Sequence, residues 1–337
     1  MSQRRRVAVT GATGLVGSYL TRALVADGGY EVRASRRPDS PTVLLAEAAA
    51  QVDWVTGDLR DLDHQAELLA DADAVVHCAG LVSYRPADTA RLREMNVGIT
   101  RDLVNLALER ELPHFLHVSS IAAISPPQAD AEVHEGHRSF HEHPDTTRYA
   151  RSKYEAELEV WRGREEGLGV TVLNPAVVLG AGFWDRSSCR LFAWVDAGQR
   201  FYPPGSTGYV DVRDVAAFAK TCLAGEPRDA RYVLSAENWT YERYFREVAA
   251  ALTVDPPTVR VNRWQAELAW RAEAARSTLL RREPLLTRES ARRSLGELTL
   301  SNTASLEAGA TYRPVAETIA EVAAAYRATQ ARGWGVL

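Results

Sequence analysis

A chain of 337 residues is long enough to bury a large hydrophobic core and to form more than one folding unit. Hydrophobic residues make up 46% and charged residues 25%, which excludes a disordered or membrane-spanning chain. A net charge of -4 gives no electrostatic basis for binding nucleic acid, and the three cysteines have no metal-ligand spacing. With no signal-peptide pattern at the N-terminus, we expect a cytoplasmic protein without nucleic-acid or membrane partners.

Short apolar runs bounded by turn residues or charges alternate with helical patterns in the first half of the chain. They predict strands at 7–10, 30–35, 52–55, 74–78, 115–119 and 170–173. The helical patterns between them cover 15–26, 91–109 and 147–166. Such alternation is typical of right-handed βαβ units. The sequence therefore predicts an α/β fold, a Rossmann doubly wound parallel sheet.

The pattern changes after residue 175. Proline and glycine interrupt the chain at 203–205 and 255–257, and a long helix with mixed charge is predicted at 264–282. We predict that residues 1–175 form the dinucleotide-binding core. Residues 176–337 are expected to form mainly a smaller C-terminal substrate-binding region, with the segment at about 208–225 returning to the core.

The first predicted strand runs into a glycine-rich turn that opens the first predicted helix. Its glycines are Gly11, Gly14 and Gly17. In this context the first glycine permits a tight turn, the second lets the backbone approach a pyrophosphate, and the third lets the helix pack on the strand. The helix N-terminus then offers free N–H groups and a positive dipole end to phosphate. The pattern predicts a dinucleotide site.

The second predicted strand ends in Arg36 and Arg37, where an NAD-preferring site usually has Asp or Glu for the ribose 2′-OH. A guanidinium is always charged and binds phosphate bidentately, so this pair favours a 2′-phosphate and hence NADP(H). Asp58 follows the third strand, in position for the adenine amino group. The Cys-Ala-Gly stretch at 78–80 is small enough to permit close approach of the cofactor.

Tyr149 and Lys153 are four residues apart in a predicted helix, which places both side chains on one face. A nearby ammonium favours the phenolate, so we expect the pKa of Tyr149 to be lowered and its hydroxyl to exchange a proton near neutral pH. Ser120 follows the fifth strand, at the edge where open α/β sheets bind ligands. Its hydroxyl is expected to hydrogen-bond the reacting oxygen.

These motifs occur in the order found in the extended short-chain dehydrogenase/reductase family, which the chain resembles over residues 5–225, with a weaker echo at 312–319. The resemblance implies a catalytic triad of Ser120, Tyr149 and Lys153, with Lys153 also binding the nicotinamide ribose, and a homodimer. The cofactor residues it implies, together with those argued above, are Gly11, Thr13, Gly14, Leu15, Val16, Arg36, Arg37, Asp58, Leu59, Cys78, Ala79, Gly80, Tyr149, Lys153, Pro175, Val177 and Val178.

Three branches of that family differ beside the triad. Sugar-nucleotide 4,6-dehydratases carry an acidic pair next to the catalytic hydroxyl, whereas Ile-Ala-Ala follows Ser120 here. Sugar-nucleotide epimerases mostly hold NAD and often have a lysine shortly after the fourth strand, where this chain has Leu-Val-Ser, although Asn174 before Pro175 also occurs in them. Two segments, VRASRRP at 32–38 and SSI at 119–121, resemble the branch of dihydroflavonol reductases and 3β-hydroxysteroid dehydrogenases.

We therefore expect an NADP(H)-dependent oxidoreductase that transfers hydride between the nicotinamide and a carbonyl or alcohol of a small organic substrate. Tyr149 is its expected general acid/base. Two alternatives stay open: an NAD(P)-dependent sugar-nucleotide epimerase, and a non-catalytic NADP-binding sensor or scaffold, which the intact triad disfavours.

The segment 121–147 is rich in proline, charge and histidine, and we expect it to form a lid over the substrate. Its histidines, at 134, 137, 141 and 143, raise the idea of a metal, but the triad chemistry needs none, so no metal is expected. Trp161 and Trp264 are interpreted as packing residues. Candidate substrate-pocket aromatics, about half of them expected in the core, are Trp184, Phe192, Trp194, Phe201 and Tyr202.

Overall fold

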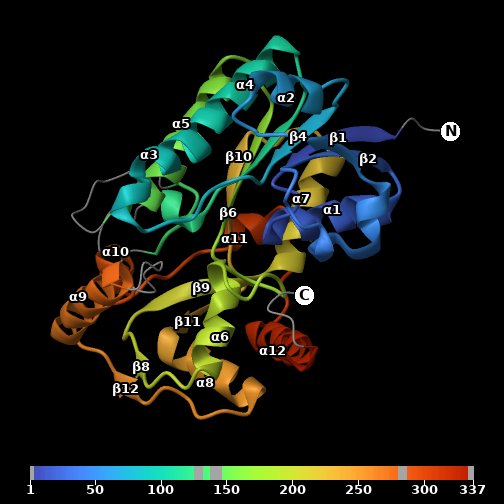
Figure 1. The fold of residues 1–337 in the computed structure, drawn as a ribbon. Coiled ribbons are helices and arrows are strands. Elements are labelled where there is room, and N and C mark those ends of the chain that lie inside the picture. Colours follow the sequence, from blue (N-terminus) through green and yellow to red (C-terminus); the bar gives the residue numbers. More distant parts are fainter. Residues whose placement is uncertain (1–3, 125–131, 137–145, 280–286, 333–337) are drawn as a thin grey trace.

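The computed structural model describes residues 4–124, 132–136, 146–279 and 287–332. A seven-stranded sheet with the order β10-β6-β5-β4-β1-β2-β3 forms its centre, and every neighbouring pair in it is parallel (Figure 1). The strands are β1 (Arg5–Thr10), β2 (Tyr30–Arg36), β3 (Asp53–Thr56), β4 (Ala74–His77), β5 (Phe115–Val118), β6 (Val170–Pro175) and β10 (Ala230–Leu234). The predicted Rossmann fold is confirmed.

Helices cover both faces of this sheet, which is why β4 and β5 are buried along their whole length. On one face α1 (Leu15–Asp27) packs against α7 (Val212–Ala224) and the 3₁₀ helix Val43–Gln51. On the other lie α2 (Leu62–Leu68), α4 (Ile99–Glu109) and α5 (Arg148–Glu165) (Figure 1). The two apolar cores of this unit fill the space between the sheet and each layer.

The helix predicted at 91–109 is interrupted. It divides into α3 (Thr89–Leu92), a π-helical stretch (Arg93–Gly98) and α4. The π-helical stretch carries the buried Asn96, which makes side-chain contacts described below. Such wide turns often occur at functional sites, because they redirect a side chain out of the regular helical register.

The rest of the chain forms a smaller unit below the large sheet in Figure 1. It contains a three-stranded sheet in the order β11-β9-β7, a β12-β8 pair, and a second aromatic core. After residue 175 the chain also supplies α7 and β10 to the large sheet unit, so both units share the C-terminal half. The smaller unit consists of β7 (Val177–Leu179), α6 (Arg190–Asp196), β8 (Phe201–Tyr202), β9 (Ser206–Asp211), β11 (Glu237–Thr240), α8 (Tyr241–Leu252), β12 (Val259–Arg260), α9 (Arg263–Leu279), α10 (Arg288–Arg293) and α12 (Val315–Ala331). The short helix α11 (Thr303–Glu307) packs against β10 of the large sheet.

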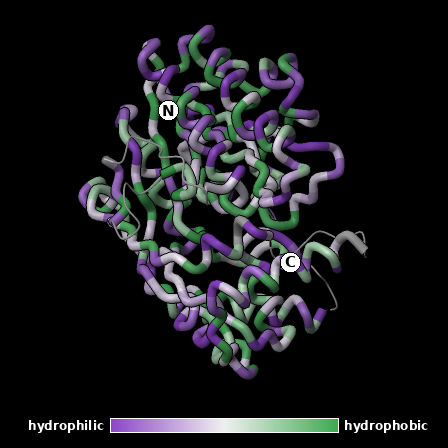
Figure 2. The backbone as a smooth tube through the Cα atoms, turned by 90° about the vertical axis from the view of Figure 1, so that its left-hand side faces the viewer, coloured by the Kyte–Doolittle hydropathy of each residue, from purple (hydrophilic) through white to green (hydrophobic). Residues whose placement is uncertain are grey.

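Hydrophobic and hydrophilic segments alternate along the backbone through both units (Figure 2). In the part of the chain that the structure describes, no helix is both long and apolar enough to cross a bilayer. One packing prediction is wrong: Trp264, near the start of α9, is 70% exposed. Trp161, in contrast, lies half-buried on α5, where it packs against the core and under the guanidinium of Arg231.

Candidate active site

The glycine-rich turn lies between β1 and α1 and forms a tight cradle. Gly11 has a positive φ of 69°, which favours glycine, and a Cβ there would lie 2.6 Å from the Ala79 backbone nitrogen. A Cβ at Gly17 would lie 2.1 Å from the Gly11 carbonyl oxygen. The N-cap of α1, Gly14, has no side-chain cap, so the first-turn N–H groups face outward as a phosphate site requires. These residues fit a dinucleotide.

Arg36 and Arg37 lie at the end of β2, beside this cradle. The Arg36 guanidinium stacks over the Trp54 ring at 5.1 Å, and its Nε donates to the Thr56 hydroxyl at 3.3 Å. Arg37 is exposed. Hydrogen bonds from Arg60, which sequence reasoning did not single out, lower the pKa of Asp58 to about 2, so this carboxylate is fully charged and already paired. An adenine amino group therefore has to share Asp58 with Arg60.

The remaining expected cofactor residues line the same edge of the sheet. Thr13 lies in the glycine turn, Leu15 and Val16 begin α1, Leu59 follows Asp58, and Cys78 and Ala79 follow β4. Pro175 ends β6, and Val177 and Val178 belong to β7. The β1–β4 boundary, where the strand order reverses, lies at the centre of this edge, and such switch points are where open α/β sheets bind ligands.

The three expected catalytic residues are brought together at the carboxyl end of β5. Ser120 follows that strand, and its side chain lies close enough to Tyr149 to act on the pKa of the tyrosine hydroxyl. The N-cap of α5, Thr147, accepts a hydrogen bond from the Ala150 N–H at 3.0 Å and so fixes the start of the helix at the tyrosine. One turn later Lys153 is buried, and its Nζ donates to the Val118 carbonyl at 3.2 Å.

The expected lowering of the Tyr149 pKa is not found. This pKa is raised to about 12, mainly by burial; the neighbouring Tyr84 contributes to the rise, and Ser120 and Arg293 oppose it. The Lys153 ammonium donates a hydrogen bond to the β5 backbone, and it is not among the groups that shift the pKa of Tyr149. Burial thus outweighs the charge effect that the four-residue spacing suggested. Tyr84, whose ring meets the Tyr149 ring edge-on at 5.9 Å, was missed by sequence reasoning.

Asn96 connects the loop after β4 to helix α5. Its Oδ1 accepts from the Leu81 N–H at 2.7 Å, and its Nδ2 donates to the Leu81 carbonyl and to the Ser152 hydroxyl. The neighbouring Gly80 lies over Lys153, since a Cβ at that position would be 3.9 Å from the Lys153 Nζ. This clamp fixes the loop that faces the expected cofactor against α5.

A second contact network joins Asn174, which the sequence analysis singled out, to Glu157 and Arg231, which it did not. Asn174 donates through its Nδ2 to the Ser120 carbonyl at 2.9 Å and to a Glu157 carboxylate oxygen at 2.5 Å. The other Glu157 oxygen accepts from Arg231 at 2.5 Å. Asn174 is fully buried, and its Oδ1 has no hydrogen-bond partner among the described residues. The 149, 153, 157 spacing on one helix face was the signal available in the sequence.

Much of the expected lid lies outside the described residues, as do His137, His141 and His143. Of the described part, residues 132–136 contact the body of the protein. Val133 forms a parallel bridge with Leu300, and a Glu135 carboxylate oxygen accepts from the Val233 N–H at 3.0 Å. His134 is described, and its Nδ1 accepts from the Gly136 N–H within this turn.

The candidate substrate-pocket aromatics belong mostly to the second core. Trp184, Phe192 and Tyr202 are buried there, and the Trp184 ring meets Tyr326 edge-on at 5.1 Å. Trp194 packs against that core and Phe201 is 53% exposed. The aromatic side chain beside the catalytic tyrosine is instead Tyr84.

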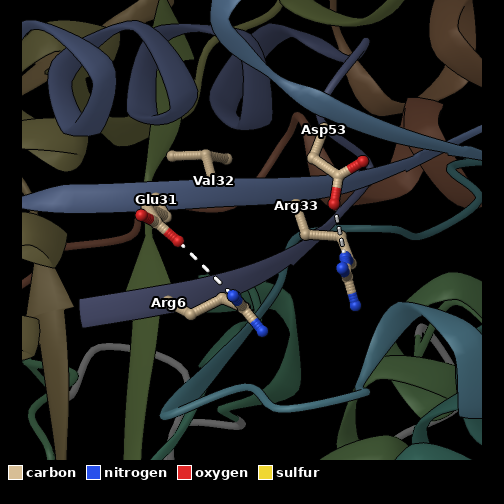
Figure 3. A pocket seen from close by; sticks show the side chains of 5 residues that line it. All are labelled: Arg6, Glu31, Val32, Arg33 and Asp53. Carbon is tan, nitrogen blue, oxygen red and sulfur yellow. Dashed lines mark hydrogen bonds and ion pairs between the residues drawn. The ribbon is translucent and has the colours of Figure 1, made fainter. Parts of the chain in front are cut away.

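A separate small pocket opens near the amino ends of the first strands, at the opposite edge of the sheet (Figure 3). It is lined by Arg6, Glu31, Val32, Arg33 and Asp53. Its charges pair among themselves, since Arg6 contacts Glu31 at 3.5 Å and Arg33 contacts Asp53 at 2.7 Å. No charged group of this lining is therefore left for a ligand, and we assign it no function.

Comparisons with known proteins agree with this geometry. A model of the NAD dependent epimerase/dehydratase family matches residues 7–229. The sterol demethylase protein B of Methylococcus capsulatus is 33% identical over 237 residues, which cover 69% of this chain and 70% of that protein. Cinnamoyl-CoA reductase 1 of Petunia hybrida is 29% identical over 247 residues, 69% of this chain and 72% of that protein.

Solved structures share the whole fold. The crystal structure of gox2253 superposes with a TM-score of 0.81 at 27% identity, covering 97% of this chain and 98% of that one. A nucleoside-diphosphate-sugar epimerase from Pseudomonas aeruginosa superposes with a TM-score of 0.76, covering 97% and 99% of the two chains. At 20% identity the second likeness shows the fold alone.

Proposed function

Because this chain belongs to the NAD dependent epimerase/dehydratase family, we propose that it is an NADP(H)-dependent reductase of a small organic carbonyl compound. Members of this family bind a nicotinamide dinucleotide, and the chain is accordingly an enzyme of the oxidoreductase type. In the proposal, Ser120, Tyr149 and Lys153 are the catalytic residues.

One observation carries the proposal: Ser120 and Tyr149 lie next to each other at the carboxyl end of β5, and Lys153, buried one turn further along α5, is bonded to the Val118 carbonyl of the same strand. Ile121, Ala122 and Ala123, all buried, follow the serine, so no acid or base stands there for water elimination. Reductases among the sequence relatives, such as cinnamoyl-CoA reductase, support the same branch.

The chemistry of reduction follows from the state of the tyrosine. A bound nicotinamide cofactor supplies the hydride for the carbonyl carbon. With a pKa raised to about 12, Tyr149 carries its proton at physiological pH and donates it to the carbonyl oxygen as negative charge develops there. Ser120 donates a hydrogen bond to the same oxygen. In the reverse reaction the same hydroxyl would receive its proton back from the alcohol.

The NADP(H) preference rests on the end of β2. Arg36 is preoriented there by stacking on Trp54, and Arg37 is exposed next to it. Two guanidinium groups at this position favour a 2′-phosphate and offer no acceptor for a 2′-hydroxyl. The epimerase alternative has weaker support, because Asn174 is buried and engaged by Ser120 and Glu157.

A panel of carbonyl compounds incubated with NADPH tests the proposal. It should include aromatic aldehydes, cyclic ketones and sugar nucleotides, with loss of reduced-nicotinamide absorbance as the readout. We expect consumption with at least one ketone or aldehyde and none with sugar nucleotides. Interconversion of sugar nucleotides without net consumption would favour the epimerase. Tight NADPH binding with no turnover across the panel would favour the sensor.

A further inference from the structure

The helix that carries the catalytic residues holds one more buried ionisable group on the same face. Glu157 follows Lys153 by one turn of α5, and its carboxylate is completely buried. Burial of an unpaired carboxylate is strongly unfavourable, so the Glu157 carboxylate needs partners in the interior. Those partners are Arg231 on β10, and Asn174 on β6, each at 2.5 Å.

One branch of this network reaches the catalytic serine. The Asn174 Nδ2 that donates to Glu157 also donates to the Ser120 carbonyl at 2.9 Å. On its other side, the Ser120 hydroxyl oxygen accepts from the Ala122 N–H at 3.2 Å. The Ser120 main chain is thus held where the chain leaves β5. The group that holds it is the Asn174 side-chain amide, and Glu157 holds that amide in turn.

The other branch concerns charge around the catalytic lysine. The titratable groups that face Lys153 are Glu157 on its own helix, His77 and Cys78 at the end of β4, and His117 on β5. Burial lowers the pKa of His77 to about 3, lowers that of His117 well below its usual range, and raises that of the Cys78 thiol to about 12. Among the described residues, Glu157 is therefore the one negative charge facing the lysine at neutral pH.

We propose that Glu157 is a positioning residue of the active site. Arg231 holds its carboxylate in place. Glu157 in turn fixes the Ser120 main chain through Asn174 and keeps Lys153 in its charged form. The proposal rests on the catalytic roles proposed for Ser120 and Lys153. Arg231 is itself held from a second side, since its guanidinium lies 5.6 Å from the Trp161 ring centre.

The composition of the chain provides a direct test. The sequence contains two lysines, Lys153 and Lys220, so an NMR spectrum of lysine-labelled protein has two side-chain signals. Lys220 pairs with Asp27 at 2.8 Å on the surface, and Lys220→Arg assigns its signal. Burial lowers the pKa of Lys153 to about 8, and in the wild-type protein its signal should titrate there, well below that of Lys220.

Removing the charge of Glu157 should then lower the Lys153 titration midpoint. Glu157→Gln keeps an oxygen that accepts from Asn174 but removes the charge, and we expect the midpoint to fall by about one pH unit, as for the loss of a close opposite charge. Glu155→Gln, a charge removal at a half-buried position of the same helix, should leave the midpoint unchanged. An unchanged midpoint in Glu157→Gln would overturn the proposal, and so would a wild-type Lys153 that titrates like Lys220.

A double variant separates positioning from a purely structural role. Glu157→Gln with Arg231→Gln removes both buried charges and should recover much of the stability lost in the single variant. Because the Glu157 carboxylate is absent from the double variant as well, the lowered titration midpoint should persist there. Recovery of the midpoint together with stability would show a structural role alone and would contradict the proposal. The titration needs no substrate, so its outcome does not depend on whether the proposed reductase activity is found.

Discussion

The carboxylate of Glu157 and the guanidinium of Arg231 form an ion pair of 2.5 Å in the interior, with side-chain exposures of 0% and 8%. The pair joins α5, which carries Tyr149 and Lys153, to β10, the outer strand of the large sheet. A buried ion pair therefore links the helix of the proposed catalytic residues to a strand from the C-terminal half.

Breaking this pair should cost far more stability than breaking a surface pair. Removal of one partner leaves an uncompensated buried charge, so we expect Arg231→Gln to lower the free energy of unfolding by about 3–5 kcal/mol. Glu155→Gln, which removes a surface pair with Arg151 on the same helix, should cost less than about 1 kcal/mol. Urea unfolding of both variants measures the difference, and equal losses would contradict the distinction.

The proposed roles of the triad predict different consequences for two substitutions. Tyr149→Phe removes the proton donor but keeps the ring against Tyr84, so turnover should fall about 10²–10⁴-fold while NADPH binds nearly normally. Lys153→Met should weaken both turnover and NADPH affinity, since the resemblance gives that residue a second role at the nicotinamide ribose. Steady-state kinetics and calorimetry measure the two effects. Full reductase activity in Tyr149→Phe would require another acid.

Cofactor preference should depend on the arginines that end β2. Charge-assisted bidentate bonds contribute about 1.5–3 kcal/mol, so NADPH should bind roughly ten- to a hundredfold more tightly than NADH. The variant with Arg36→Ala and Arg37→Ala should lose most of this difference. Arg110→Ala, an exposed arginine at the end of α4, is the matched control and should keep it. Equal calorimetric affinities of the wild-type protein for the two cofactors would refute the preference.

Three buried histidines should make the protein sensitive to acid. Burial lowers the pKa of His77 to about 3 and of His114 to about 4, and lowers that of His117 well below its usual range. The unfolded chain takes up these protons near pH 6.5, whereas the folded chain does not until much lower pH. Stability is therefore present above pH 6.5 and is lost as pH falls below it, with a slope of roughly 4 kcal/mol per pH unit from the three histidines together.

Urea unfolding between pH 7 and pH 5 tests this slope, and its loss of stability should begin near pH 6.5. His117→Leu should reduce the slope by about one third, because one histidine no longer titrates on unfolding. That position suits the test, since neither ring nitrogen of His117 has a hydrogen-bond partner in the described part of the structure. A stability that is flat across this pH range would contradict the burial argument.

The sequence by itself determined the fold and the cofactor cradle, because both depend on local patterns. Runs such as AVVH in β4 and FLHV in β5 have one structural solution when helices flank them, a strand buried on both faces. The glycine spacing at 11, 14 and 17 likewise reflects short-range steric demands, and the structure shows backbone atoms where a Cβ at Gly17 would lie. The four-residue spacing of Tyr149 and Lys153 specified a shared helix face for the same reason.

Only the tertiary structure decided what surrounds those side chains. The nearby lysine predicted a lowered Tyr149 pKa, but burial raises it. The extent of that burial depends on Tyr84 and other residues distant in sequence. The partners of Glu157 lie 17 and 74 residues away along the chain, so no local pattern could identify them. Trp264 has the large apolar side chain typical of a packing residue, but it is exposed because nothing in the described chain covers its face of α9. Local spacing fixes which side chains share a face, and long-range packing fixes their dielectric environment and their charges.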